Sequence, residues 1–174
     1  TLGETLRRLH TSAERHEGWN EREHADTTPT DRVNAAVADA LYELHAGDRR
    51  ELTGVVTDAA AVIRETSPAV GVTHGDVTVG NVLFGADAES CTLVDWETAA
   101  WFDAYFDRAK AELWLFQLFS PLFSLPESSV VAAFREAYGG STAAVRRIQA
   151  YKLLQLCRMV PRIERLGPYS SWQR

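Results

Sequence analysis

The sequence predicts an α+β fold that is mostly helical and carries a few short strands. Apolar residues recur at helical spacing through most of the 174 residues. Between residues 70 and 94 this spacing is replaced by short apolar or β-branched runs, which are typical of strands. The length and the 45% hydrophobic content suit one compact core. We therefore expect a single domain over residues 1–174.

Capping residues and helical spacing predict three helices before Pro68. Thr1 and Glu4 have the form of a capping box, which opens the first helix. Asp48, with Glu51 three residues later, is expected to open the third. The predicted ranges are 2 to about 16, 33 to 44 with a stop at Gly47, and 48 to 67, with a polar loop over 17–30.

Three short strands are predicted next, over residues 70–73, 82–84 and 92–94. The last two are expected to form a hairpin, because the intervening residues have the composition of a turn. After Asp103 the chain returns to helical spacing. The predicted helices are a buried one over 104–119, one from Pro126 to Gly139, and a long one capped by Ser141, with a kink or stop near Pro161.

Composition excludes several classes of protein. The chain has no apolar run of about 18 residues, so we expect no membrane span. It shows no charged and then apolar leader, which favours a cytoplasmic protein over a secreted one. Cys91 and Cys157 lack metal-ligand spacing, and we expect both to be buried, reduced thiols.

Charge is unevenly distributed around the net value of −6. From Ser141 onward, seven basic residues face a single acid, Glu164. Basic and aromatic residues are not interleaved there, so we expect no nucleic-acid partner. We interpret the basic segment as a solvated helix face that balances the acidic remainder. That acidic remainder is consistent with a cationic substrate or with a simple demand for solubility.

Asp76, Asn81 and Asp95 carry the chemistry that the sequence predicts. Metal-assisted phosphoryl transfer uses one acid to orient the attacking hydroxyl, and an amide and a second acid to hold Mg²⁺. Each residue alone could be a turn or cap residue. However, His74, Asp76 and Asn81 reproduce the His-x-Asp-x-x-x-x-Asn spacing of kinase catalytic loops. We predict that Asp76 is catalytic and that Asn81 and Asp95 bind the metal.

Four nearby residues are candidates for supporting roles. We expect His74 to be a structural histidine that fixes the catalytic loop. Glu97 either contacts the metal through water or caps the next loop, and both interpretations stay open. Asp103 and Asp107 open the predicted buried helix, where the helix dipole favours aspartate, so capping is their expected role.

Two parts of a kinase are missing from the sequence. A kinase covers the phosphates with a glycine-rich loop and positions them with a strand lysine. The chain contains no Gly-x-Gly-x-x-Gly, and its only lysines are Lys110 and Lys152. Both fall in predicted C-terminal helices, so we expect neither to be that strand lysine.

Three motifs resemble those of the aminoglycoside phosphotransferase family, kinase-like enzymes that include choline and small-metabolite kinases. The family pattern is His-Gly-Asp-Leu-His-Pro-Gly-Asn-hydrophobic-Leu, then hydrophobic-Asp-Trp-Glu, then Gly-Asp-Pro-x-x-Asp-Leu-Ala. Residues 74–76 and 80–83 match the first motif and residues 94–97 the second, while 102–109 match the third at both aspartates and the final alanine. The chain departs from the family at Val77-Thr78-Val79, which replaces Leu-His-Pro, at Phe102, which replaces glycine, and at Ala104, which replaces proline.

The resemblance implies the C-terminal lobe of a protein-kinase-like fold. It makes Asp76 the catalytic aspartate, Asn81 and Asp95 the magnesium ligands, and ATP and Mg²⁺ the cofactors. The expected reaction moves the γ-phosphate to a hydroxyl of a small molecule that is aminoglycoside-like, choline-like or another metabolite. The nucleotide-clamping N-terminal lobe, absent from this sequence, is then expected in cis or in trans. The alternatives are a naturally truncated, non-catalytic pseudokinase-like binding module and a metal-dependent phosphatase or nuclease.

Overall fold

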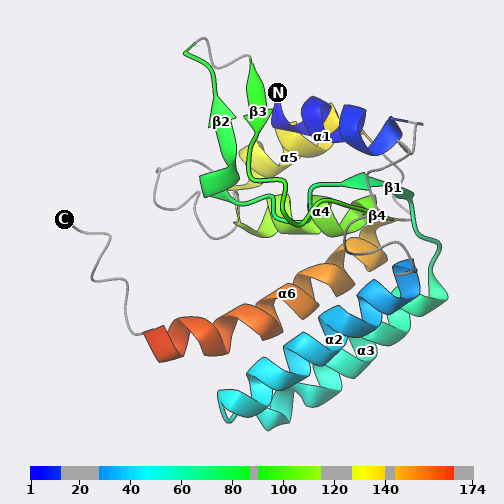
Figure 1. Ribbon diagram of the computed structural model, residues 1–174, viewed down its shortest axis with the longest axis vertical. Coiled ribbons are helices and arrows are strands. Elements are labelled where there is room, and N and C mark those ends of the chain that lie inside the picture. The colour runs from blue at the N-terminus through cyan, green and yellow to red at the C-terminus, as the bar shows by residue number, and fades with distance from the viewer. Residues whose placement is uncertain (13–27, 87–89, 115–126, 140–143, 167–174) are drawn as a thin grey trace.

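The computed structural model describes residues 1–12, 28–86, 90–114, 127–139 and 144–166, and it confirms a mostly helical α+β fold (Figure 1). The elements in chain order are α1 (Leu2–Thr11), α2 (Pro29–Ala46), the 3₁₀ turn η1 (Arg50–Leu52), α3 (Thr53–Glu65), β1 (Val70–Thr73), the 3₁₀ turn η2 (Val79–Asn81), β2 (Val82–Phe84), β3 (Cys91–Leu93), β4 (Ala100–Asp103), α4 (Ala104–Ala111), α5 (Glu127–Tyr138) and α6 (Val145–Leu166).

The long helices form one layer of the molecule. In Figure 1, α2 and α3 lie side by side, and α6 packs against both. On the other side, α1 packs against α5 beside the β2–β3 hairpin, and α4 lies between the two groups. The larger apolar core joins the long helices through buried side chains such as Leu44, Ile63 and Tyr151. A second core around Leu6 and Phe134 underlies the hairpin.

Two antiparallel strand pairs lie beside the predicted catalytic loop, residues 74–81. The predicted hairpin forms, with Val82 opposite Leu93. The other pair joins β1 to β4, with Thr73 opposite Ala100. Strand β4 was not predicted, because it is a four-residue segment that continues directly into α4 without a turn. Its pairing with β1 places Asp103 opposite Val70, so α4 starts beside the beginning of β1, and the Ala104 N–H donates to the carbonyl of Ala69 at 2.8 Å.

Three helix boundaries differ from the predictions. Helix α1 ends at Thr11 and not near residue 16, and Ser12 after it has an extended conformation (φ −63°, ψ 112°). Helix α2 begins at Pro29, inside the predicted loop, because Thr28 and Asp31 form a reciprocal capping box. Asp48 does not open the third helix. Its φ of 56° places it in the left-handed region, which aspartate tolerates, and its N–H donates to the carbonyl of His45 at the end of α2.

Helix α6 does not stop at Pro161 but continues to Leu166. Pro161 is buried against Gly47, where an added Cβ would lie only 2.4 Å from the proline Cβ. This close packing on the end of α2 holds the helix beyond the proline. The expected cap at Ser141 and the predicted loop residues 17–27 lie outside the described residues.

The basic residues of α6 are not the uniformly solvated face that the sequence suggested. Arg147 and Lys152 are 4% and 3% exposed, respectively. Arg147 forms an ion pair with Asp103, and Lys152 forms one with Glu112 at 2.7 Å. Buried charges require such partners, and the partners lie at the end of α4 and at the end of β4, far away in sequence.

In the described part of the chain, no helix is long and apolar enough to cross a membrane.

Candidate active site

The segment between β1 and β2 forms a loop whose backbone is held by hydrogen bonds to Asp107 of α4. The Asp107 carboxylate is fully buried and accepts hydrogen bonds from the backbone N–H groups of His74 (2.6 Å) and Gly75 (2.8 Å). Nε2 of His10, on α1, lies 3.2 Å from the same carboxylate. Asp107 therefore does not cap its own helix, contrary to expectation. It fixes the loop that carries Asp76.

Gly75 allows the sharp turn at this point. Its φ is +81°, in the region that favours glycine, and an added Cβ would lie 2.5 Å from the carbonyl oxygen of Thr98. The Thr98 hydroxyl donates to the carbonyl of His74 at 2.9 Å. The loop thus turns tightly between α4 and residue 98, and this turn presents Asp76 at its tip.

His74 lies inside the loop and is fully buried. Its Nε2 lies 2.9 Å from the carbonyl oxygen of Val94, and its Nδ1 lies 3.2 Å from the backbone nitrogen of Asp76. A neutral imidazole with its proton on Nε2 satisfies both contacts, because Nδ1 can then accept from the Asp76 N–H. The ring also contacts the Trp96 ring, with centroids 4.7 Å apart. His74 links the loop to the segment that carries Asp95.

Asn81 contacts Asp76 through its amide nitrogen. Nδ2 of Asn81 donates to the backbone carbonyl of Asp76 at 3.0 Å and to its Oδ2 at 2.9 Å. Because both contacting atoms are acceptors, the NH₂ group must face them and Oδ1 must point elsewhere. That oxygen remains available to a cation, and among the described residues it has no hydrogen-bond donor.

Asp95 lies next to Asn81 because the β2–β3 register brings the two segments together. The backbone N–H of Val94 donates to the carbonyl of Asn81 at 3.1 Å. Asp95 has a φ of 64°, an uncommon conformation for a residue other than glycine, and such backbone strain is concentrated at functional sites. Its carboxylate is exposed and has no partner among the described residues.

The donor set suits Mg²⁺, which takes hard oxygen ligands, keeps several waters and needs few protein groups. Asn81 through its Oδ1 and Asp95 through its carboxylate would hold the Mg²⁺ ion. No group of three or more histidine, cysteine, aspartate or glutamate side chains that could bind a metal occurs within the described ranges. A site built on one carboxylate and one amide therefore depends on ligands from the substrate or from water.

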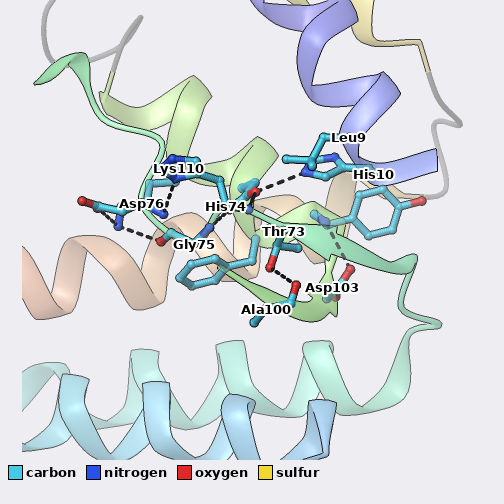
Figure 2. Close-up of polar contacts among 12 residues, drawn as sticks. Leu9, His10, Thr73, His74, Gly75, Asp76, Ala100, Asp103 and Lys110 are labelled. Atoms are coloured by element: carbon cyan, nitrogen blue, oxygen red, sulfur yellow. Dashed lines mark hydrogen bonds and ion pairs between the residues drawn. The ribbon is translucent and has the colours of Figure 1, made fainter. Parts of the chain in front are cut away.

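Lys110 is a site residue that the sequence analysis missed. Its Nζ lies 2.5 Å from Oδ1 of Asp76 and 3.1 Å from the carbonyl oxygen of Gly75 (Figure 2). It follows Asp107 by three residues, so both side chains lie on the face of α4 that meets the loop. Lys110 could have been identified from the sequence, because it lies three residues after Asp107, which was already predicted to lie near the site.

Two predicted supporting residues lie outside this cluster. Asp103 caps α4 by accepting from the Tyr105 N–H, as expected, and also accepts from Arg147 and from the Tyr151 hydroxyl. Burial, followed by the nearby Asp103 carboxylate, raises the pKa of Tyr151. Glu97 lies in an exposed turn after Asp95 and makes no hydrogen bond or ion pair with another described side chain.

A cavity of about 200 Å³ opens beside Asp76. Asp76, Thr78 and Lys110 form the wall on the loop side, and residues of α6 form the opposite wall. The predicted catalytic carboxylate is therefore accessible from a space large enough for a small molecule.

A family model described as the phosphotransferase enzyme family matches residues 1–151 of the chain. The chain belongs to this family. The match includes α1, the predicted catalytic loop, the hairpin and the first part of α6, whereas the α6 residues that line the cavity lie beyond it. A search of curated proteins found no significant match. Membership of this family implies phosphotransferase chemistry.

Proposed function

We propose that this chain is the C-terminal lobe of an ATP- and Mg²⁺-dependent phosphotransferase that moves the γ-phosphate to a hydroxyl of a small molecule. The contact between Asn81 and Asp76 carries the proposal. It joins a predicted metal ligand to the predicted catalytic carboxylate while leaving Oδ1 of Asn81 available. Metal-assisted phosphoryl transfer requires this juxtaposition, because the phosphate and the acceptor hydroxyl must meet in line.

Each residue of the site has a part in this reaction. Asp76 accepts a hydrogen bond from the acceptor hydroxyl and takes its proton as the new oxygen–phosphorus bond forms and the bond from the γ-phosphorus to the departing ADP breaks. Lys110 and Asn81 hold the two carboxylate oxygens of Asp76, so its orientation is set before the acceptor binds. Asn81 and Asp95 would hold Mg²⁺, which when bound offsets the charge of the phosphates. His74 and Asp107 keep the loop in place.

The nucleotide clamp is expected from an N-terminal lobe, supplied in cis or in trans. The basis is the lack of a glycine-rich loop in the printed sequence, together with the engagement of Lys110 by Asp76. A lysine held at 2.5 Å from the catalytic carboxylate does not serve as the strand lysine that positions the α- and β-phosphates.

The test is ATP-dependent phosphorylation by the native gene product across a panel of hydroxylated metabolites, with and without a chelator of Mg²⁺. Asp76→Ala is expected to lower turnover by about 10²- to 10⁴-fold while sparing Mg·ATP affinity, because it removes the proton acceptor. Asp95→Ala is expected to weaken Mg·ATP binding itself. Asp58→Ala, which removes an exposed aspartate on α3, is the control and should match the parent protein.

Unchanged turnover in Asp76→Ala would show that the catalytic loop is wrongly assigned. If the native gene product binds Mg·ATP or an acceptor but transfers no phosphate to any of the panel, the chain is better explained as a non-catalytic binding module. Phosphoester hydrolysis without ATP would instead support a phosphatase.

A further inference from the structure

The wall of the cavity beside Asp76 is rich in cations. Lys110 from α4 and Arg158 and Arg162 from α6 all line it, whereas Asp76 is the one carboxylate among its lining residues in the described part of the chain. Arg158 and Arg162 lie one helical turn apart, so their side chains project from the same face of α6. This distribution is unexpected in a chain whose net charge is −6.

The two arginines have carboxylate partners that do not line the cavity. Nη2 of Arg158 lies 3.1 Å from Oδ2 of Asp39, and Nε of Arg162 lies 2.9 Å from Oε1 of Glu43. Both acids are on α2. Each contact uses one nitrogen of a guanidinium group, which leaves most of its N–H donors for another acceptor. The ion pairs therefore hold the arginines in place and leave donors for a ligand.

Gln155 adds an independent sign of a ligand. It is 7% exposed and lines the same cavity, and its Nε2 donates to the carbonyl of Phe106 at 3.3 Å. Its Oε1 is buried and has no hydrogen-bond partner among the described residues. An unsatisfied buried acceptor is costly, so it calls for a donor that the described protein does not supply. A hydroxyl group of a molecule in the cavity becomes such a donor when the Gln155 side chain rotates to present Oε1, which is buried in the observed orientation.

We infer that the acceptor is a small anionic polyol, a molecule that carries both hydroxyl groups and a carboxylate or phosphate. This inference rests on the proposed function, because it names the substrate class of the same site. One hydroxyl lies at Asp76, another donates to Gln155, and the anionic group pairs with Arg158 and Arg162. A charge-assisted contact with a guanidinium is among the stronger hydrogen bonds in proteins. A polycationic acceptor would meet like charge at the same wall.

The size of the cavity supports a small acceptor. Its volume of about 200 Å³ lies below the roughly 300–1,000 Å³ of pockets that hold drug-sized ligands. Phe106 and Met159 contribute apolar surface to it, against which the carbon chain of a polyol can pack. We therefore expect a molecule closer to a single sugar than to a several-ringed aminoglycoside.

The experiment compares four probes built on one six-carbon chain: sorbitol, gluconate, sorbitol 6-phosphate and glucamine. Binding to the native gene product is measured by titration calorimetry without nucleotide. We expect gluconate or sorbitol 6-phosphate to bind at least about tenfold more tightly than sorbitol, because of the arginine contacts. The two anionic probes distinguish a carboxylate site from a phosphate site. Glucamine, with an ammonium group, should bind more weakly than sorbitol. Added salt should weaken only the anionic probes.

A matched pair of variants tests the role of Arg158. Arg158→Gln removes the guanidinium and should reduce binding of the preferred anion by about tenfold or more. Asp39→Asn breaks the same ion pair but retains the guanidinium, so it should bind that anion at least as well as the parent protein. A circular dichroism spectrum of each variant establishes that it is folded. If both variants weaken binding equally, the ion pair is structural and the inference is wrong.

The outcomes separate this inference from the proposed function. If neither anion binds more tightly than sorbitol, or if glucamine binds most tightly, the anionic acceptor is excluded whether or not the protein transfers phosphate. If an anion binds through Arg158 but no probe or panel metabolite is phosphorylated, the anion site stands and the phosphotransferase proposal fails.

Discussion

Helix α4 carries two buried carboxylates, Asp107 in its first turn and Glu112 at its C-cap, and the two differ in the groups that they hold in place. Both are 0% exposed. Asp107 accepts from two backbone N–H groups of the predicted catalytic loop. Glu112 accepts instead from charged side chains, which come from α4 itself, α5 and α6: Arg108, Arg135 and Lys152.

The difference in donors explains the difference in role. Backbone N–H groups are fixed to the chain, so a carboxylate that accepts from them sets the path of a loop. Charged side chains are attached to separate helices, so a carboxylate that accepts from them joins those helices. One end of α4 therefore positions the site and the other ties the fold together. The comparison predicts that loss of Glu112 affects the whole molecule, whereas loss of Asp107 affects one loop.

Glu112→Ala is expected to have the largest effect. It leaves buried cations without their carboxylate, and breaking a buried ion pair in this way costs about 3–5 kcal/mol. Urea unfolding followed by circular dichroism measures the change in the free energy of unfolding. Arg135→Gln is the control, because the Arg135 side chain is 45% exposed and its loss should cost at most about 1 kcal/mol. A cost below about 1 kcal/mol for Glu112→Ala would contradict a structural role.

Acid should remove part of the same contribution, though less than the alanine variant does, because a protonated Glu112 still fills its site. Burial by itself would raise the pKa of Glu112, but hydrogen bonds from Arg135 and Lys152 outweigh it and lower the pKa to about 2. A carboxyl whose pKa is lower when folded stabilises the fold fully above its ordinary value of 4.5. That contribution is lost as the pH falls towards about 2.

The measurement for this pH dependence is the free energy of unfolding of the parent protein and of Glu112→Gln across the acid range. The difference between them should stay constant above about pH 4.5 and shrink towards pH 2. A difference that does not change with pH would show that Glu112 is not ionised in the folded protein or that its pKa is not lowered.

Asp107→Asn should have a smaller and more local effect. The amide oxygen of asparagine replaces only one of the two carboxylate oxygens that accept from the His74 and Gly75 N–H groups. The NH₂ group then faces the other N–H, and two donors cannot form a hydrogen bond with each other. We expect a cost of about 1–3 kcal/mol, the usual range for an unsatisfied buried group. Hydrogen exchange measured by NMR should show faster exchange of the His74 and Gly75 amides. Glu112→Ala should instead lower protection throughout the core, and equal patterns for both variants would remove the distinction drawn between them.

Local signals in the sequence identified most of the fold. The change of spacing after residue 69 located β1 and β2 at the observed residues and β3 to within one residue. Capping residues located the start of α1, where Thr1 and Glu4 form the predicted box. These features depend on residues within a few positions of each other, so they can be predicted directly from the sequence.

Apart from errors at the ends of helices, the wrong predictions involve contacts between distant segments. Strand β4 exists because it pairs with β1, about 30 residues earlier. Arg147 and Lys152 look like solvated residues until α4 and β4 supply buried carboxylates. For the candidate site, the sequence indicated Asp76, Asn81 and Asp95, whose roles stay predictions, but not the contact of Lys110 with Asp76. Helical periodicity shows which residues share a face, but not which loop that face will meet.

The chain's two lysines provide the finest test of the comparison. Lys110 pairs with Asp76, and the two side chains are 15% and 36% exposed, whereas Lys152 is buried and pairs with the fully buried Glu112. Lys110→Met should therefore change the free energy of unfolding by no more than about 1 kcal/mol, the usual value for a partly exposed pair. Lys152→Met should cost more, because it leaves Glu112 with one fewer buried partner.

The functional effects of the two lysine variants should be reversed. Without Lys110, the Asp76 carboxylate loses the contact that orients one of its oxygens, and misplacement of a catalytic group can reduce turnover on the order of a hundredfold. The loss should appear in kcat with little change in KM for Mg·ATP, and Lys110→Arg should recover part of it by restoring the charge. Lys152→Met, assayed well below its unfolding temperature, should keep its kcat. If Lys110→Met instead proves as unstable as Lys152→Met and its kcat is unchanged, then Lys110 belongs to the framework of the fold and both ends of α4 are structural.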